Sequence, residues 1–200
     1  GCWYRCDAAS TPGDRRQGQA VVTATVGVDP GAKWCGVVVR DGADAVWWRV
    51  VAESDHGHRF LPACEAAVRE AFTAAGTNPL VAVEDAVPPG GFRDGKKQFA
   101  RPVDILALGR AVGWLHHAVL LLTPRVVLVA PAGHGHRPLG SYPRVLVSDA
   151  EARSADRVRG WGRPAGQSST LRHARSAWDV AGAGPVAARV DAARAGVGAV

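Results

Sequence analysis

A β-branched run, Val21–Val28, ends in the sharp turn Asp29–Gly31 (DPG), and this pattern constrains the fold more than any other. Alternating Val and Thr residues favour a strand, and an Asp-Pro-Gly turn ends it. Two further strand-like runs follow, Trp34–Val39 and Ala45–Val51, and the dipeptide Asp41–Gly42 between them is typical of a hairpin. We therefore expect three antiparallel strands, the first of which ends in an acid.

Helices and strands alternate in the next part of the chain. The segment Leu61–Ala75 has helical spacing and an Ala-rich composition, and Gly76 is placed to end the helix. A short buried strand, Leu80–Val83, precedes a helix over Val103–Leu121 that has an apolar face. A fifth strand is predicted over Arg125–Val129.

The order of the predicted elements indicates the fold class. After an irregular stretch with only a weak helix around Tyr142–Arg153, a final amphipathic helix is predicted over Thr170–Ala188, with N-cap residues at its start. Three strands, a helix, a strand, a helix, a strand and a terminal helix follow the RNase H-like order. We therefore predict an α/β protein with a mixed five-stranded sheet flanked by helices.

One folded domain is expected from the length of 200 residues and the hydrophobic content of 47%. Residues 1–20 mix Asp, Arg, Gly, Ser and Pro without periodicity, and we expect them to form a disordered extension. The folded domain is then expected to occupy residues 21–200.

Nothing in the sequence favours a membrane protein. The strongest apolar run, Ala118–Leu122, is far shorter than the roughly 18 to 20 residues that cross a bilayer, and the N-terminus lacks a signal-peptide pattern. The four cysteines are irregularly spaced for a zinc site and favour free thiols in a reducing compartment: Cys2, Cys6, Cys35 and Cys64. A cytoplasmic protein is expected.

The net charge of +6 is concentrated near the C-terminus, where eight arginines stand against four acids from Glu151 onward. A basic region of this kind is compatible with contacts to nucleic-acid phosphates. An Arg-rich, Lys-poor composition is equally typical of a GC-rich coding sequence. Charge alone therefore leaves both interpretations open.

Three acids stand at positions that the predicted fold can bring together. Asp29 and Glu84 end two strands that can lie side by side, and Asp179 lies on the last helix. Phosphodiester hydrolysis by two Mg²⁺ ions about 3.5 to 4 Å apart needs a cluster of carboxylate ligands. The acids are therefore candidates for a site of that chemistry.

Four segments resemble the RuvC Holliday-junction resolvases. Val26–Gly31 (VGVDPG) is similar to the first RuvC motif, and Val81–Asp85 (VAVED) resembles the second acidic strand. Leu108–Gly113 (LGRAVG) is similar to the helix that follows, and His173–Ala181 (HARSAWDVA) resembles the closing helix of phage-type RuvC-like resolvases. The four segments occur in the family's order, and the resemblance favours the phage or actinobacterial type.

The resemblance implies a homodimer that binds a four-way DNA junction and nicks two strands symmetrically with Mg²⁺ or Mn²⁺. Carried over to this sequence, it makes Asp29, Glu84 and Asp179 metal ligands. The chain departs from the family at Ser176, where many RuvC proteins have an acid or a His. His173 can supply the missing polar group as ligand or general base, and an interpretation as a surface residue at the helix N-terminus stands beside it.

Candidate DNA contacts come from three regions of the chain. An aromatic side chain in the loop after Glu84 can wedge into an opened junction, and arginines on the last helix can bind phosphates. In the competing interpretation, these side chains are solvated residues of a loop and of a helix surface and have no role in binding DNA. The candidate contacts are Lys33, Phe92, Arg93, Lys96, Lys97, Arg172 and Arg175.

Two pairs of histidines, His56 with His58 and His134 with His136, have too few partners for a metal site. We interpret both pairs as loop histidines.

Other functions remain open. A general or RNA-directed nuclease similar to the YqgF-like group has the same fold, and a non-catalytic DNA-binding module is compatible with Ser176 at an expected ligand position. The sugar-kinase and actin ATPase fold shares the Asp-Gly strand turn, but the chain is too short for its two lobes.

Overall fold

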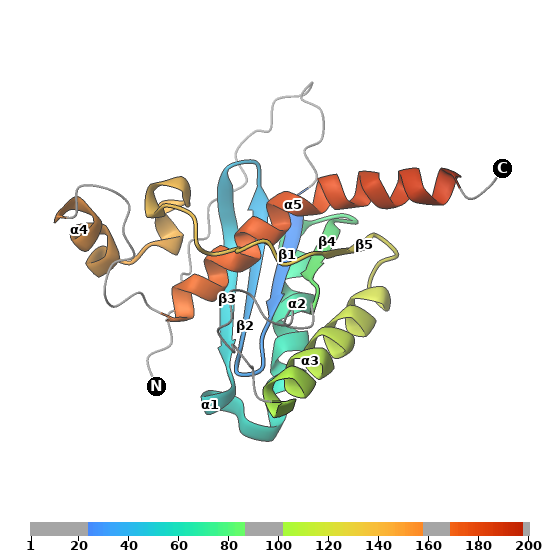
Figure 1. Ribbon diagram of the computed structural model, residues 1–200, viewed down its shortest axis with the longest axis horizontal. Coiled ribbons are helices and arrows are strands. Elements are labelled where there is room, and N and C mark those ends of the chain that lie inside the picture. Colours follow the sequence, from blue (N-terminus) through green and yellow to red (C-terminus); the bar gives the residue numbers. More distant parts are fainter. Residues whose placement is uncertain (1–23, 87–101, 158–168, 198–200) are drawn as a thin grey trace, which may run out of the picture.

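A computed structural model describes residues 24–86, 102–157 and 169–197 (Figure 1). Its strands form one mixed five-stranded sheet in the order β3-β2-β1-β4-β5. Strand β1 pairs antiparallel with β2 and parallel with β4, β2 pairs antiparallel with β3, and β4 pairs parallel with β5. The strands are β1 (Thr25–Pro30), β2 (Trp34–Asp41), β3 (Asp44–Ala52), β4 (Leu80–Glu84) and β5 (Val126–Val129).

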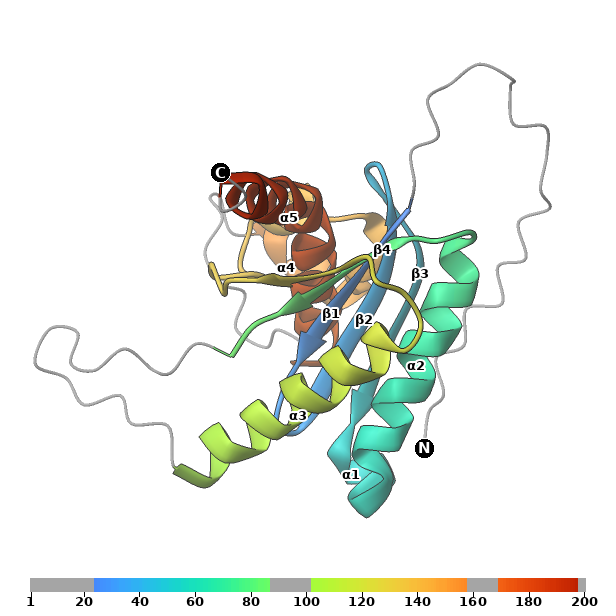
Figure 2. The same cartoon turned by 90° about the vertical axis from the view of Figure 1, so that its right-hand side faces the viewer.

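Helices cover both faces of this sheet. Helices α2 and α3 lie on one face, and α5 crosses the other (Figure 2). The helices are α1 (Glu53–His56), α2 (Phe60–Ala75), α3 (Pro102–Leu120), α4 (Asp149–Arg157) and α5 (Ser169–Val197), with short 3-10 turns at Gly57–Arg59, Leu139–Ser141 and Arg144–Leu146. This topology confirms the predicted α/β class and RNase H-like strand order. The expected extension 1–20 lies outside the described residues.

Alternation along the strands divides the core into two layers. Val26 and Val28 of β1 face α2 and α3, where they join Val37, Val68 and Leu115. The intervening positions face α5 and join a second layer that includes Val38, Ala174, Ala177 and Trp178. The period of two in the strand sequences thus places one side chain in each layer in turn.

Two glycines allow α5 to lie unusually close to the sheet. A Cβ atom on Gly27 would lie 1.9 Å from the carbonyl oxygen of Ala177, and one on Gly36 would lie 2.1 Å from that of His173. Both neighbouring atoms belong to the helix backbone, so no side-chain movement would relieve the overlap. Because Gly36 pairs with Asp29 across the β1–β2 ladder, the close approach occurs directly beside that acid.

The C-terminal half of the chain differs from the prediction in two places. Helix α5 continues through Pro185 to Val197, beyond the expected end at Ala188. Small residues keep this part of the helix on the sheet, since a Cβ on Gly184 would lie 2.8 Å from that of Ala82. The weak helix expected at Tyr142–Arg153 is instead two 3-10 turns followed by α4.

Within the described residues, α3 is long and apolar enough to cross a membrane by length and composition alone. Its inner face is buried against the sheet through Ala111, Val112, Leu115, Ala118 and Val119. One face of α3 therefore packs on the sheet, as its apolar periodicity predicts, while its other face is exposed.

The two cysteines in the described residues, Cys35 and Cys64, are both buried and free, as expected. A hydrogen bond with Cys64 and burial raise the pKa of the Cys35 thiol well above its usual range. Cys35 therefore stays in the thiol form at neutral pH.

Replacing Gly36 with Ala should lower the free energy of unfolding by about 2 to 3 kcal/mol, because the added methyl group meets the helix backbone. Urea unfolding of the wild type and the variant measures this loss. Gly196→Ala is the control, since a Cβ there meets nothing within 4 Å. Equal stability of Gly36→Ala and the control would contradict the close packing of α5.

Candidate active site

Two acids lie side by side at the carboxyl ends of β1 and β4. These strands are parallel, and their ladder pairs Val28 with Val83, so Asp29 and Glu84 are the next residues on each strand. Asp29 is 8% exposed, and both carboxylates line the same pocket. The structure thus brings together the two strand-end acids of the prediction.

Helix α5 contributes two polar side chains to this pair. The Nδ1 atom of His173 lies 2.8 Å from Oδ2 of Asp29, and Ser176 Oγ lies 3.4 Å from Oε2 of Glu84. The ring of Trp34 stacks on the His173 imidazole, with centroids 6.2 Å apart and planes at 9°. His173 is therefore held on two sides and is not the free surface residue of the competing interpretation.

The loop of residues 130–137, named here the histidine loop, supplies a further imidazole. His134 Nδ1 lies 2.9 Å from Oε1 of Glu84, and the flanking Gly133 and Gly135 have positive φ angles of 70° and 75°. From the sequence, His134 was interpreted as a loop residue, and its contact with Glu84 was not predicted. The glycines on either side were a signal, because they mark a backbone shaped to place one side chain.

A pocket of about 250 Å³ lies between the strand ends, the start of α5 and the histidine loop. It is lined by Asp29, Glu84, Pro131, Gly133, His134, His136, Arg172, His173 and Ser176. Carboxylates, imidazoles and one guanidinium make this lining polar and able to bind a cation or a phosphate.

Burial and crowding change the protonation of Glu84. Its pKa is raised to about 8, first by burial and then by the hydrogen bond and negative charge of the neighbouring Asp29. Burial also lowers the pKa of His134, against the opposing charges of Asp179 and Asp29. Burial therefore favours the neutral form of both partners in this 2.9 Å contact.

Asp179 lies on α5 but does not line this pocket. It is 1% exposed, and its Oδ2 accepts hydrogen bonds from the Gly135 N–H and the Tyr142 hydroxyl, both at 2.9 Å. Its Oδ1 lies 3.2 Å from Nε of Arg137. The structure therefore does not assemble the three predicted carboxylates around one pocket.

The predicted DNA contact at Arg175 is wrong. Its side chain is fully buried and donates to the Leu146 carbonyl at 2.9 Å and to both carboxylate oxygens of Glu151 at 3.1 and 3.3 Å. A guanidinium buried in this way joins α5 to α4 and is closed to a phosphate in solution.

The other predicted DNA contacts have different positions. Arg172 lines the pocket, and Lys33 is exposed in the turn between β1 and β2. Phe92, Arg93, Lys96 and Lys97 lie outside the described residues.

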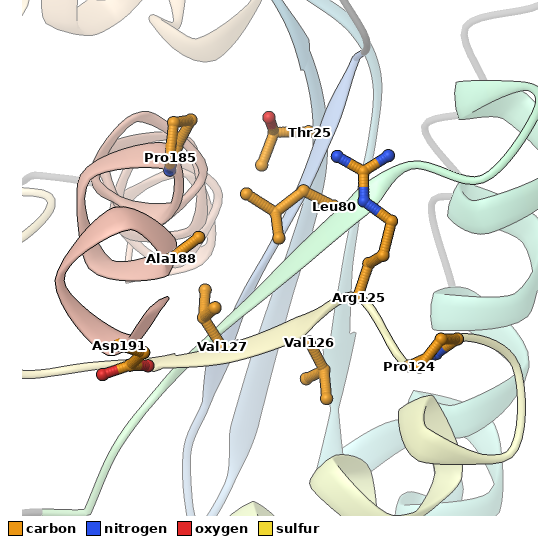
Figure 3. A pocket seen from close by; sticks show the side chains of 9 residues that line it. All are labelled: Thr25, Leu80, Pro124, Arg125, Val126, Val127, Pro185, Ala188 and Asp191. Atoms are coloured by element: carbon orange, nitrogen blue, oxygen red, sulfur yellow. The ribbon is translucent and has the colours of Figure 1, made fainter. Parts of the chain in front are cut away.

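A second hollow, of about 460 Å³, lies at the opposite end of the strands (Figure 3). Thr25, Leu80 and Val126 contribute to it from the first residues of β1, β4 and β5, and Pro185 contributes from α5. Its lining combines apolar side chains with the polar side chains of Thr25, Arg125 and Asp191. The acids are at the other, carboxyl end of the parallel strands, where ligand sites of α/β sheets usually lie.

The donor atoms of the polar pocket fit one hard divalent cation. Among the residues that the structure describes, no three or more His, Cys, Asp or Glu side chains are grouped as a metal site. Asp29 and Glu84 nevertheless present carboxylate oxygens, the ligands that Mg²⁺ and Mn²⁺ prefer. Burial, and then the adjacent Asp29, raise the pKa of Glu84 to about 8.

The chain was compared with known proteins. No protein-family model and no curated protein matches the sequence. Among solved structures, RuvC of T. thermophilus in complex with a Holliday junction substrate matches with 22% identity and a TM-score of 0.42 over 80% of this chain and 90% of that chain. A second structure of Thermus thermophilus RuvC matches with 20% identity and a TM-score of 0.38, over 84% and 96%.

A ROK hexokinase from Thermus thermophilus also matches, with 23% identity and a TM-score of 0.36, over 56% of this chain and 37% of that chain. The fold of this chain is defined by its own strand order and strand directions, independently of these three matches.

The protein should lose stability between pH 4.5 and pH 8 because of Glu84. A carboxyl group whose pKa rises from 4.5 to about 8 on folding stabilises the folded state fully below pH 4.5 and loses that contribution as pH rises toward 8. The loss should be on the order of 2 to 4 kcal/mol, and Glu84→Gln should abolish it. Urea unfolding in EDTA at pH 5, 6.5 and 8 measures both proteins.

The variant Glu84→Gln also shows which result would contradict this prediction. If the wild type and Glu84→Gln lose equal free energy of unfolding between pH 5 and pH 8, another group causes the loss and the proposed crowding at Glu84 is wrong.

Proposed function

We propose that this protein is a divalent-metal-dependent endonuclease that nicks branched DNA, a RuvC-like Holliday-junction resolvase. The observation that carries the proposal is the pair Asp29 and Glu84 at adjacent strand ends of an RNase H-like sheet, each held by an imidazole. Sequence motifs in the family's order support the same function, and so does the polar lining of the pocket.

Asp29 and Glu84 would hold Mg²⁺ or Mn²⁺ through their carboxylate oxygens. When bound, such an ion supplies positive charge that activates water and neutralises the phosphodiester. Glu84 would have to be ionised to act as a ligand. The packing of α5 and the histidine loop leaves Asp29 8% exposed and the Glu84 side chain 14% exposed.

His173 and Arg172 would act on the substrate from the start of α5. The contact with Asp29 occupies Nδ1 of His173 and fixes the ring, which leaves Nε2 as the nitrogen that can accept a proton from water. Arg172 lines the pocket and would bind a phosphate oxygen. Lys33, Phe92, Arg93, Lys96 and Lys97 are also proposed to contact DNA.

Cleavage of a labelled four-way junction tests this function directly. Wild-type protein with Mg²⁺ or Mn²⁺ should nick the junction, and EDTA should stop the reaction. Asp29→Asn and Glu84→Gln should each lower the rate by about 10²-fold or more while junction binding in EDTA persists, because each removes one carboxylate ligand. Asp191→Asn, an exposed acid on the same helix α5, is the control and should cut at the wild-type rate.

The substrate panel separates the alternatives. Equal cutting of the junction, a linear duplex and single-stranded RNA would favour a general or RNA-directed nuclease of the YqgF-like kind. Tight junction binding without cutting by the wild type would favour a non-catalytic DNA-binding module, for which Ser176 at a ligand position is the specific observation.

A homodimer is the assembly that symmetric nicking of a junction requires, and α3 offers the surface for it. Large apolar side chains are exposed on and next to this helix: Val103, Ile105, Leu106, Trp114, Leu120 and Leu121. Gly109 and Gly113 lie one turn apart, and a Cβ on either would meet nothing within 4 Å in this chain. Exposed apolar patches of this kind mark interaction surfaces, and helical glycines allow a second helix to approach closely.

Charge on this face should break the dimer. The double variant Leu106→Glu and Leu121→Glu should be monomeric by light scattering at a concentration where the wild type is dimeric, because each glutamate loses its water at the interface. Val46→Glu, which changes an exposed valine on β3, should remain dimeric. A monomeric wild type, or a dimeric double variant, would refute α3 as the interface.

We further propose that the protein acts in the cytoplasm, in agreement with the buried free thiols of Cys35 and Cys64 and with the proposed DNA substrate. The resemblance of His173–Ala181 to phage-type resolvases supports a role in phage or actinobacterial DNA processing.

A further inference from the structure

Among the described residues, the hydrogen bonds and the ion pair of the Asp179 carboxylate are made with the histidine loop and Tyr142. Oδ2 accepts the backbone N–H of Gly135 and the Tyr142 hydroxyl, each at 2.9 Å, and Oδ1 lies 3.2 Å from the Arg137 guanidinium. The Tyr142 hydroxyl in turn accepts the backbone N–H of Arg137 at 3.0 Å. One buried carboxylate thus fixes two backbone positions of the loop, on both sides of His136.

The loop lies directly on α5 at this point. A Cβ on Gly135 would lie 2.8 Å from the carbonyl oxygen of Arg172 and 3.1 Å from the backbone nitrogen of Ser176, and its φ of +75° favours glycine as well. Gly135 is also next to His134, whose ring reaches Glu84. Because His134 and Gly135 are neighbours in the chain, a shift of the Gly135 backbone would also shift the His134 imidazole relative to Glu84.

We propose that Asp179 is a positioning residue that holds the histidine loop on α5 and thereby places His134 against Glu84. The proposal deepens the proposed function, because it makes His134 a member of the site and removes Asp179 from the set of metal ligands. Asp179 and the loop form one unit, named here the loop clasp: Asp179, Tyr142, Gly135 and the backbone of Arg137.

The two carboxylate oxygens of Asp179 have different surroundings. Oδ2 already accepts two hydrogen bonds. Oδ1 is buried without a hydrogen-bond partner among the described residues and lies 3.2 Å from Nε of Arg137. A metal ion at Oδ1 would lie beside that positive charge, and Asp179 does not line the pocket of Asp29 and Glu84.

Amide exchange measured by NMR on the whole protein tests the clasp. The Gly135 amide should exchange about tenfold faster or more in Asp179→Asn than in the wild type, since its acceptor loses its charge. Tyr142→Phe should accelerate the same amide less, because it removes one donor and leaves the carboxylate. Asp191→Asn makes the same change on an exposed position of α5 and should leave the Gly135 amide unchanged.

The His134 ring reports whether the clasp positions the site. Its imidazole proton signals, identified by their loss in His134→Gln, should shift in Asp179→Asn and stay unchanged in Asp191→Asn. Mn²⁺ alone, titrated by calorimetry, separates positioning from ligation. Asp179→Asn should bind Mn²⁺ within about threefold of the wild-type Kd, whereas Asp29→Asn should weaken binding about 10- to 100-fold.

Junction cleavage completes the test. If Asp179 acts through His134, the losses in rate caused by Asp179→Asn and His134→Gln should not add in the double variant. Unchanged Gly135 exchange in Asp179→Asn would overturn the clasp, and so would a loss of Mn²⁺ affinity equal to that of Asp29→Asn. A protein that cuts no DNA would refute the proposed function alone, because exchange and ring signals still decide the clasp.

Discussion

The site depends on the contact between the α5 backbone and the two glycines of the central strands. Gly27 and Gly36 leave no side chain between sheet and helix, and the helix occupies that space with the backbone of Ala177 and His173. Since Gly36 stands opposite Asp29 in the ladder, the same contact that closes the core places an imidazole on the acid. The packing of α5 on the sheet and the position of His173 beside Asp29 therefore depend on the same contact. A methyl group at Gly36 would disturb both.

This contact also fixes the rotation of α5, and the rotation divides its polar residues into two groups. With Ala177 against β1, His173 and Ser176 are directed to the strand-end acids and contact them. Asp179, three residues after Ser176, contacts the histidine loop instead. Helix α5 thus lines the pocket through Arg172, His173 and Ser176 and contacts the loop through Asp179.

The strand order and the two strand-end acids followed from the sequence, because period-two alternation and turn residues are local signals. The surroundings of Asp179 did not, since its partners Gly135 and Tyr142 lie 44 and 37 positions away in the sequence. The contact of His134 with Glu84 spans 50 positions. The flanking glycines marked a special backbone at His134, but they did not identify Glu84 as its partner.

The two carboxylate–imidazole pairs are alike in geometry, because Nδ1 faces a carboxylate in both, at 2.8 and 2.9 Å. Burial and the nearby Asp29 raise the pKa of Glu84 to about 8, and burial lowers the pKa of His134. A divalent cation held by Asp29 and Glu84, as proposed, would favour the ionised form of Glu84 through its positive charge. The proposed loop clasp would hold His134 against Glu84 in either protonation state, since none of its contacts involves the Glu84 carboxylate.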